Sequence, residues 1–423
     1  MSSFDAVDFF TDVSLIDDPN PYFEYLRKRG PAVPLSKHPV VAVVGYDEAL
    51  AIFRDDEHYS AVNAATGPFG LPFERGGAQD LTSQIEAYRS TVPYGALIVT
   101  QDPPAHTRSR KLLLGMITPK RLQENEAFMW RLADRQIDEF IARGSFDAVA
   151  DYAQPYATLV IADLLGVPED DHQAFRKLLG VMPGQVDGSS QQAGNNPLEQ
   201  IGLHFFNYIT DRRNQPRADV LTGLAQAKYP DGSEPSVIDV VTIAAFLFGA
   251  GQDTTVRLLA AALRFLAEDP DLQRKLRKER NLIGDFLEEV LRLEGPVKSD
   301  FRLVRRPVKI SELAVVPGTT VMMLLGAANR DPRRFERPND FQLGRKNVRE
   351  HLAFGRGIHA CVGALLARAE ARISLERLFD RTSDIRLNED KHGRAGARRF
   401  SYEPTFLLRG LRELHLELTP RGD

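Results

Sequence analysis

The chain has 423 residues, of which 43% are hydrophobic and 26% are charged, a balance typical of globular proteins that bury a large core. With 54 Lys and Arg residues against 58 Asp and Glu residues, the formal net charge is −4. This charge argues against a nucleic-acid-binding protein, because phosphate binding requires an excess of cations. The single cysteine excludes an intrachain disulfide.

The N-terminus is acidic and lacks the basic segment that begins a signal peptide. The longest apolar stretch, 240–251, is interrupted only by Thr242 and is far shorter than the about 20 residues that a membrane-spanning helix needs. We therefore expect a cytoplasmic protein without membrane insertion.

Helical patterns dominate the chain, and no repeat or linker divides it, which predicts a mainly α (α+β) fold with one domain over 1–423. Amphipathic spacing predicts helices over 119–143 and 236–269, and the second has Ser236 as its N-cap with Asp239 three residues later. Short β-branched runs predict strands in a small sheet. The predicted strands are 40–44, 308–310 and 319–323, and the predicted loops, either functional lids or plain surface loops, are 61–77 and 184–197.

A basic helix is predicted to begin after Asp102, which is followed by two prolines and is expected to be the N-cap. His106 and Arg110 stand four residues apart and therefore share one face of this helix. On the sequence alone, this face could simply be solvated.

The long helix over 236–269 contains Gly249 and Gly251, which together lower its helix propensity by about 2 kcal/mol relative to alanine. The hydroxyl of Thr254 can bond to the carbonyl of Ala250, four residues earlier, and open a groove. The segment could be a simple kink at a packing contact. Alternatively, Asp253 beside the Thr254 hydroxyl could relay protons.

Two further patterns follow. Glu289 and Arg292 stand three residues apart on one helix, a spacing that is common in helices. Cys361 lies in the segment Phe-Gly-Arg-Gly-Ile-His-Ala-Cys-Val-Gly over 354–363 and precedes a helical pattern. A cysteine at a helix start could be a buried structural residue, or its thiolate could be a soft ligand for iron.

These motifs together resemble the cytochrome P450 family. The cysteine segment fills every specified position of the haem-binding pattern Phe-Gly-x-Gly-x-His-x-Cys-x-Gly. Residues 250–254 resemble the oxygen-binding motif, and the pairs His106–Arg110 and Glu289–Arg292 resemble the family's His-x-x-x-Arg and Glu-x-x-Arg. The resemblance runs from about Pro19 to the C-terminus.

The resemblance implies a helix-rich triangular prism with a small β-sheet region, in which haem b (iron protoporphyrin IX) lies between the long helix and the cysteine-bearing helix. It implies a monooxygenase in which Thr254 orients the iron-bound oxygen and Asp253 helps to deliver protons. Cys361 would be the metal ligand. The cofactor-binding residues it implies are Cys361, His106, Arg110, Arg302, His359, Phe354, Gly355, Gly363, Ala250 and Gly251.

The same resemblance gives Glu289 and Arg292 a structural role. Many relatives add an arginine immediately before a phenylalanine, but Asp340 precedes Phe341 here. We expect that Arg345 can substitute as the third partner.

Motif alignment places a substrate pocket beside the haem, with the loops at 61–94 and 179–197 as its lid. Most pocket residues are apolar, which indicates a hydrophobic substrate of terpenoid, steroid or aromatic type. Lys298 could reach solvent, or it could pair with an acidic or carbonyl-bearing substrate. The pocket residues expected are Phe246, Gly249, Ala250, Val297, Lys298 and Phe406.

The sequence carries no flavin or nicotinamide motif, so electrons are expected from a separate ferredoxin and ferredoxin reductase. A monomer is the expected oligomeric state. A peroxygenase, an oxidative-coupling enzyme and a non-catalytic haem-containing ligand-binding protein remain alternatives. The cations expected to form a docking patch for an acidic ferredoxin are Arg108, Lys111, Lys120, Arg121 and Arg356.

Overall fold

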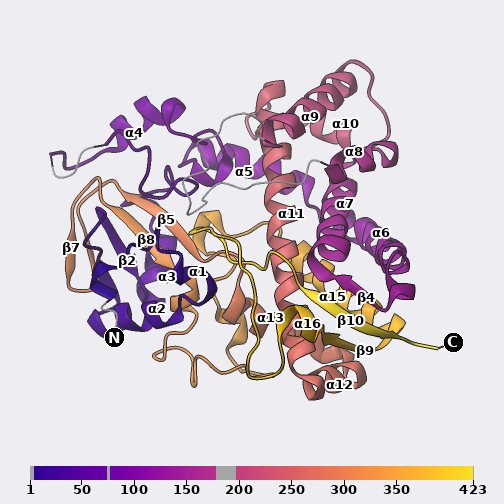
Figure 1. Ribbon diagram of the computed structural model, residues 1–423. Helices are drawn as coiled ribbons and strands as arrows, with labels where there is room; N and C mark the ends of the chain where they lie inside the picture. The colour runs from indigo at the N-terminus through magenta and orange to yellow at the C-terminus, as the bar shows by residue number, and fades with distance from the viewer. Residues whose placement is uncertain (1–3, 74–76, 178–196, 423) are drawn as a thin grey trace.

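A computed structural model of the chain describes residues 4–73, 77–177 and 197–422 (Figure 1). Helices make up most of the structure. They are α1 (Ser14–Asp17), α2 (Asn20–Arg29), α3 (Tyr46–Arg54), α4 (Thr82–Tyr88), α5 (Ala105–Met116), α6 (Pro119–Asp138), α7 (Gln154–Leu165), α8 (His172–Lys177), α9 (Pro197–Asn214), α10 (Val220–Ala225), α11 (Val237–Glu268), α12 (Pro270–Lys278), α13 (Ile283–Glu294), α14 (Leu325–Ala328), α15 (Ala364–Arg381) and α16 (Glu389–His392).

The strands form three sheets in the described part of the chain. The five-stranded sheet has the order β1-β2-β8-β5-β3, the three-stranded sheet has the order β4-β10-β9, and β6 pairs with β7. In the largest sheet β5 is antiparallel to β8, with Arg302 opposite Val321 and Asp300 opposite Met323. The strands are β1 (Ala32–Pro34), β2 (Val40–Val43), β3 (Tyr59–Ser60), β4 (Ser145–Asp147), β5 (Ser299–Val304), β6 (Val308–Ile310), β7 (Leu313–Val315), β8 (Thr320–Leu324), β9 (Thr382–Leu387) and β10 (His415–Pro420).

Helix α11 crosses the helical part of the molecule and packs against α7, α9, α13 and α15. The predicted capping box is confirmed: the Ser236 hydroxyl accepts from the Asp239 N–H, and the Asp239 carboxylate accepts from the Ser236 N–H, both at 3.0 Å. By length and composition α11 could also span a membrane, but it lies in the protein interior, as the core helix of a compact fold does.

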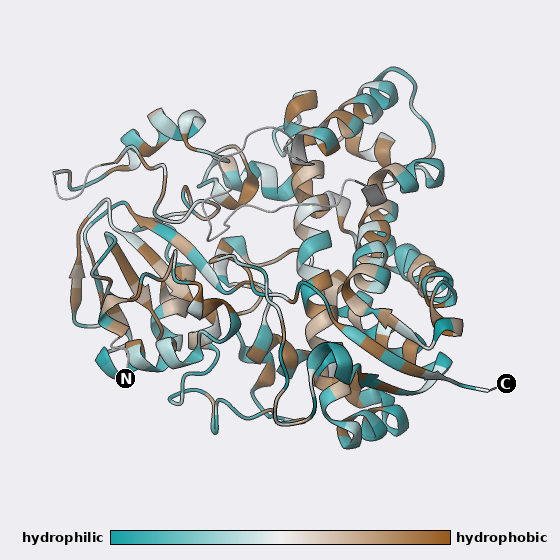
Figure 2. Cartoon of the chain, in the orientation of Figure 1, coloured by the Kyte–Doolittle hydropathy of each residue, from teal (hydrophilic) through white to brown (hydrophobic). Residues whose placement is uncertain are grey.

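The hydrophobic core has two main parts. One part lies among α6, α7, α11, α13 and α15, and the other lies on the two faces of the five-stranded sheet. Figure 2 shows hydrophobic colouring along the strands of that sheet and along α11, whereas the surface helix α12 is mainly hydrophilic. Residues of α5, α11, β5 and the loop before α15 line the space between these two parts.

The local predictions agree with the structure to different degrees. The helix predicted over 119–143 ends at Asp138, and a separate 3-10 turn covers Ile141–Arg143. The predicted strands are β2, β6 and β8, each within one residue of its expected ends. The described part of 61–77 forms turns, and 184–196 lies outside the described residues.

The predicted N-cap at Asp102 is wrong. Helix α5 begins at Ala105, and its N-terminus has no side-chain cap. Asp102 is instead buried, and its carboxylate accepts from Arg89 at 2.8 Å and lies 3.2 Å from Arg305. A buried carboxylate is stabilised more by two arginines than by orphan amides at a helix end, because it must be paired once it leaves water.

Candidate active site

A cavity of about 270 Å³ lies between α11 and the loop that precedes α15. Thr254, on α11, and Cys361, in the loop before α15, both line it. Most of the remaining lining is apolar, so ionic groups are confined to a few positions on its wall. The polar lining residues are His106, Arg110, Thr254, Thr255, Asp300, His359 and Cys361, and the apolar ones include Ile98, Val99, Phe246, Leu247, Ala250, Val297 and Leu325.

The loop around Cys361 is held in a tight path. The Cys361 N–H donates to the carbonyl of Phe354 at 2.9 Å, and Gly355 has a φ of 63°. Gly357 has a φ of 70°, and a Cβ there would lie 1.9 Å from the Phe53 carbonyl oxygen. Both positions therefore favour glycine, because the backbone is left-handed and a side chain at 357 would collide with α3.

Cys361 is accessible from the cavity, although protein atoms surround it closely. Burial raises the pKa of its thiol, and a hydrogen bond from the Gly363 N–H together with the charges of Arg110 and Arg368 opposes that rise. The residue stands three positions before the first residue of α15, as predicted. The amides at this helix start favour the thiolate form.

On α11, the Thr254 hydroxyl donates to the Ala250 carbonyl at 2.7 Å, which confirms the predicted bond. The helix stays continuous through this point. A Cβ on Gly251 would lie 3.2 Å from Cδ1 of Ile161, so the absence of a side chain lets α7 approach α11 closely. Asp253 lies beside Thr254 and pairs with Arg257, one turn later.

Two histidines and an arginine gather at one end of the cavity. The rings of His106 and His359 have centroids 4.2 Å apart, and Arg110 donates to the Ala360 carbonyl at 2.5 Å. Burial and the charges of Arg302, His106 and Arg110 lower the pKa of His359 to about 2. Burial and the charge of Arg110 also lower the pKa of His106.

This end of the cavity fits the two carboxylates of haem. Nε2 of His106 is buried and has no hydrogen-bond partner among the described residues, which is costly unless an acceptor is bound. Arg302 does not line the cavity itself; it donates to Asp300, which does, at 2.9 Å. The thiol of Cys361 and the side chains of His106, Arg110 and His359 line the cavity as the resemblance implies for haem b, whereas Arg302 does not.

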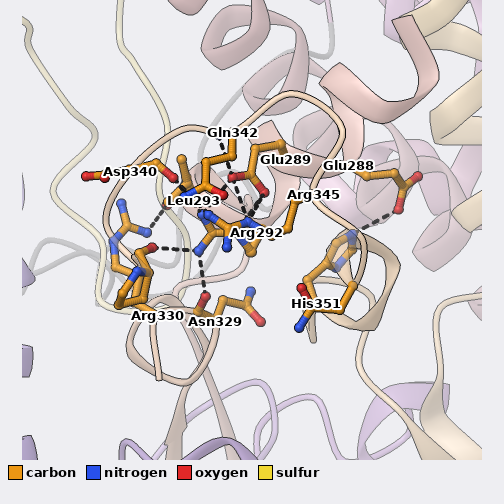
Figure 3. A network of polar contacts seen from close by, with 12 residues as sticks. Glu288, Glu289, Arg292, Leu293, Asn329, Arg330, Asp340, Gln342, Arg345 and His351 are labelled. Atoms are coloured by element: carbon orange, nitrogen blue, oxygen red, sulfur yellow. Dashed lines mark hydrogen bonds and ion pairs between the residues drawn. The ribbon is translucent and has the colours of Figure 1, made fainter. Parts of the chain in front are cut away.

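The loop before the cysteine segment is anchored by a buried ionic network (Figure 3). Glu289 and Arg292 are both fully buried and form two hydrogen bonds of 2.8 Å. Nε of Arg345 lies 3.1 Å from Glu289, which confirms the prediction that Arg345 supplies the third partner. The N–H of Gln342 also donates to Glu289, and Arg292 donates to the Asn329 carbonyl at 3.0 Å.

Lys298 does not face the cavity, contrary to expectation. Its Nζ lies 5.6 Å from the centre of the Phe9 ring, and the residue borders a separate cavity of about 20 Å³. Burial, with the charges of Arg409 and Arg257, lowers its pKa to about 7. The backbone of Lys298 is fixed by two hydrogen bonds, from its N–H to the Leu407 carbonyl at 2.8 Å and from the Leu325 N–H to its own carbonyl at 3.0 Å.

Two other predicted pocket residues lie elsewhere. Phe406 packs against Phe10 and Phe301, with ring centroids 5.3 and 6.0 Å away. Gly249 is buried in α11 but is not part of the cavity lining. Phe246 and Ala250 do line it, because their spacing of four residues keeps them on one face of the helix.

The five cations predicted to form a basic patch differ in their exposure and in their partners. Arg356 donates to backbone carbonyls of its own loop, including that of His351 at 2.9 Å. Lys120 and Arg121 both pair with Glu124, at 3.8 and 3.0 Å. Arg108 and Lys111 on α5 are exposed, and Arg108 lies 3.5 Å from Asp231; Lys120 is also exposed, at 85%.

Sequence reasoning missed two ionisable groups at this site. Asp300 lines the cavity two residues before Arg302, and strand alternation from Val297 would have placed it on the opposite face. Glu370, on α15, is fully buried and hydrogen-bonds with Thr255, which lines the cavity. Burial raises the pKa of Glu370 to about 8. An acid on a helix face otherwise marks solvent exposure, so no sequence signal pointed to it.

Comparison with known proteins gives one family. A family profile described as cytochrome P450 matches residues 200–383. Cytochrome P450 CYP199A2 of Rhodopseudomonas palustris is 32% identical over 421 residues, which cover 98% of this chain and 93% of the relative. The substrate-free structure of CYP150A6 of Mycobacterium marinum is 54% identical, has a TM-score of 0.94, and covers 99% of this chain and all of its own. CYP109E1 of Bacillus megaterium in complex with corticosterone is 26% identical, with a TM-score of 0.78 and coverage of 95% and 98%.

Proposed function

The chain belongs to the cytochrome P450 family of haem-containing monooxygenases, and we propose that it hydroxylates a hydrophobic small molecule with electrons from a separate ferredoxin. The observation that carries this proposal is the apolar cavity with Cys361 on one side and Thr254 on the other. The net reaction consumes the substrate, O2, two electrons and two protons, and it yields the hydroxylated substrate and water. We further propose a single-domain monomer that works in the cytoplasm.

Haem b, when bound, supplies O2 binding and activation, with thiolate ligation that favours O–O cleavage. Cys361 would hold the iron. The end of the cavity formed by His106, Arg110 and His359 would bind the propionates, whereas Arg302 pairs with Asp300. The charge of Arg110 and the N–H donors of the two imidazoles would fix the orientation of the ring.

The chain's own groups would move protons toward the cavity. Thr254 lines the cavity and holds its hydroxyl on the Ala250 carbonyl, so its oxygen is oriented and can accept from a water on the cavity side. Asp253 lies on the outer side of the same turn, with a side chain that is 24% exposed. A partly exposed carboxylate next to an internal hydroxyl can carry protons from solvent to that hydroxyl.

The cavity supports a hydrophobic substrate. Phe246, Leu247, Val297 and Leu325 present apolar side chains, and burying a ring or chain against them is favourable. The complex of CYP109E1 with corticosterone is consistent with a steroid-sized ligand. Because Lys298 points away from the cavity, we propose no acidic group on the substrate.

The surface beside the Cys361 loop supports a ferredoxin partner. Helix α5 carries the exposed Arg108 and Lys111, and Arg110 between them ties this helix to the cysteine loop. Exposed apolar side chains complete the surface, as in other interfaces of transient complexes. These are Leu114 at 50%, Ile358 at 36% and Leu365 at 67% exposure.

The substrate is tested by titrating the holoenzyme with steroids, terpenoids and aromatic compounds while haem absorbance is recorded. We expect saturable spectral changes with at least one class, and incorporation of one atom of labelled O2 into the product when ferredoxin, reductase and NAD(P)H are present. Thr254→Val should bind the same substrate and consume reductant, but release peroxide in place of product. Product formation from peroxide alone, with none from O2 and ferredoxin, would contradict the proposal.

The electron donor is tested by the rate of reduction at increasing ionic strength. Reduction should slow as salt rises, and it should slow further in Lys111→Glu at low salt. Lys309→Glu, on the β6–β7 hairpin, is the control and should reduce at the wild-type rate. Equal rates in both variants would argue against α5 as the docking surface.

A further inference from the structure

A single buried carboxylate connects three segments around the cysteine loop. Glu288, on α13, is 2% exposed. Its Oε2 accepts from Nη2 of Arg368 on α15 at 2.9 Å. The same oxygen lies 3.1 Å from Nε2 of His351 in the loop (Figure 3). Burial raises the pKa of Glu288, but the hydrogen bonds from Arg368 and His351 outweigh burial and bring it to about 2. Glu288 is therefore ionised at any working pH.

The hydrogen bonds define which nitrogen of His351 carries the proton. The Ala353 N–H donates to Nδ1 at 3.2 Å, so Nδ1 is the acceptor. Nε2 must then hold the proton and donate to Glu288. Burial lowers the pKa of His351, in keeping with a neutral ring. The imidazole thus ties the backbone just before Phe354 to α13.

Arg368 continues this connection to the cavity wall. Its guanidinium carbon lies 4.5 Å from the centre of the Phe354 ring, a cation–π geometry. Phe354 lines the cavity, and its carbonyl accepts from the N–H of Cys361 at 2.9 Å. Both carboxylate oxygens of Glu288 accept hydrogen bonds from the Arg368 guanidinium. This bidentate contact fixes the position of the positive charge relative to the Phe354 ring.

We propose that Glu288 and Arg368 are positioning residues for Cys361: Glu288 fixes the Arg368 guanidinium on the ring of Phe354, whose carbonyl accepts from the Cys361 N–H, and so holds this part of the loop and a permanent positive charge in place. The proposal rests on Cys361 being the haem ligand. The fixed charge stabilises the thiolate and also the more electron-rich reduced state, because both gain from a nearby cation in a poorly hydrated region.

The test measures the midpoint potential of the purified holoprotein, and the rate at which its reduced carbon monoxide complex converts to the inactive spectral form with a protonated or displaced thiolate. Arg368→Met should shift the potential to a more negative value and accelerate the conversion several-fold. Arg368→Lys keeps the positive charge but loses the bidentate contact with Glu288. Its midpoint potential should therefore return toward the wild-type value, while conversion to the inactive spectral form stays fast. Glu288→Gln should also accelerate the conversion, because Arg368 loses its anchor.

Arg372→Met is the matched control. Arg372 lies one turn further along α15, is 36% exposed, and pairs with Glu126 and Glu376 rather than with the loop. Equal potentials and conversion rates in Arg368→Met and Arg372→Met would overturn the proposal. If Arg368→Met does not fold, wild-type conversion rates in both Arg368→Lys and Glu288→Gln would overturn it as well.

The wild-type spectrum separates this inference from its premise. A thiolate-type carbon monoxide spectrum that disappears in Cys361→Ser establishes the ligand, and the variants then report on Glu288 and Arg368 alone. A wild-type spectrum without thiolate character would overturn both the ligand assignment and the positioning role.

Discussion

Arg257 holds Asp253 through two hydrogen bonds from one turn further along α11, Nε to Oδ2 at 2.8 Å and Nη2 to Oδ1 at 3.1 Å. Arg257 is 8% exposed, and its Nη1 has no hydrogen-bond partner among the described residues. The carboxylate next to Thr254 is therefore oriented by a nearly buried cation. Two roles of Asp253 follow, one in stability and one in proton transfer, and substitution can separate them.

Asp253→Asn should lower the turnover of the substrate by about 10²-fold, because the amide cannot relay protons. Substrate affinity should be unchanged, since Asp253 does not line the cavity. The variant should also lose about 1–3 kcal/mol of stability, because Arg257 is left without its counter-ion. Steady-state kinetics, substrate titration and urea unfolding measure the three effects.

The double variant Asp253→Asn with Arg257→Met is the control for this pair. Removal of the buried charge should restore much of the stability, because both partners of the ion pair are then gone. Turnover should stay low. Recovery of turnover together with stability would show that Asp253 acts through structure alone.

Gly410→Ala should displace Arg257. A Cβ at this position would lie 2.4 Å from Cγ and 2.7 Å from Nη1 of Arg257, which leaves no room for the present side-chain path. We expect the free energy of unfolding to fall by about 1–3 kcal/mol, as at other overpacked sites, and we expect turnover to be lower. Thermal unfolding measures the change in stability. Gly284→Ala, on α13, is the control: no atom lies within 4 Å of a Cβ at this position, so the substitution should be neutral or slightly stabilising.

Arg345→Ala should destabilise the protein by about 3–5 kcal/mol, because Glu289 loses one of the two arginines that neutralise it in a fully buried position. Urea unfolding measures the change. Arg349→Ala, nearby and 70% exposed, should change stability by less than about 0.5 kcal/mol. Similar effects of the two substitutions would contradict the importance of burial here.

Glu370 should make the protein less stable as the pH rises. Burial raises its pKa to about 8 in the folded state, above the usual value of about 4.3. Between these values the folded state holds a proton that the unfolded state has lost, so stability falls with rising pH and levels off above about 8. Glu370→Gln, which can still bond Thr255, should remove this slope between pH 5 and pH 8. An unchanged slope in urea unfolding would mean that Glu370 is ionised when buried.

Several features of this protein were determined by the sequence alone because they depend on spacing within one element. The capping box of α11, the bond from Thr254 to Ala250 and the Glu289–Arg292 pair each join residues three or four positions apart. The period of the helix brings such residues together wherever the helix lies. The cysteine motif could also be recognised from the sequence, because its glycines occupy positions whose local backbone conformation favours glycine.

Tertiary structure decided the features that depend on where elements meet. The pairing of β5 with β8 places Asp300 on the cavity side. Backbone hydrogen bonds with Leu407 and Leu325 fix the backbone of Lys298, whose side chain lies away from the cavity. Asp102 is not a cap because it pairs with Arg89, 13 residues earlier, and with Arg305, which comes from a distant part of the chain. Long-range partners like these have no spacing rule: a side chain's direction follows from strand register and packing, and a charge goes to the partners that compensate its loss of water.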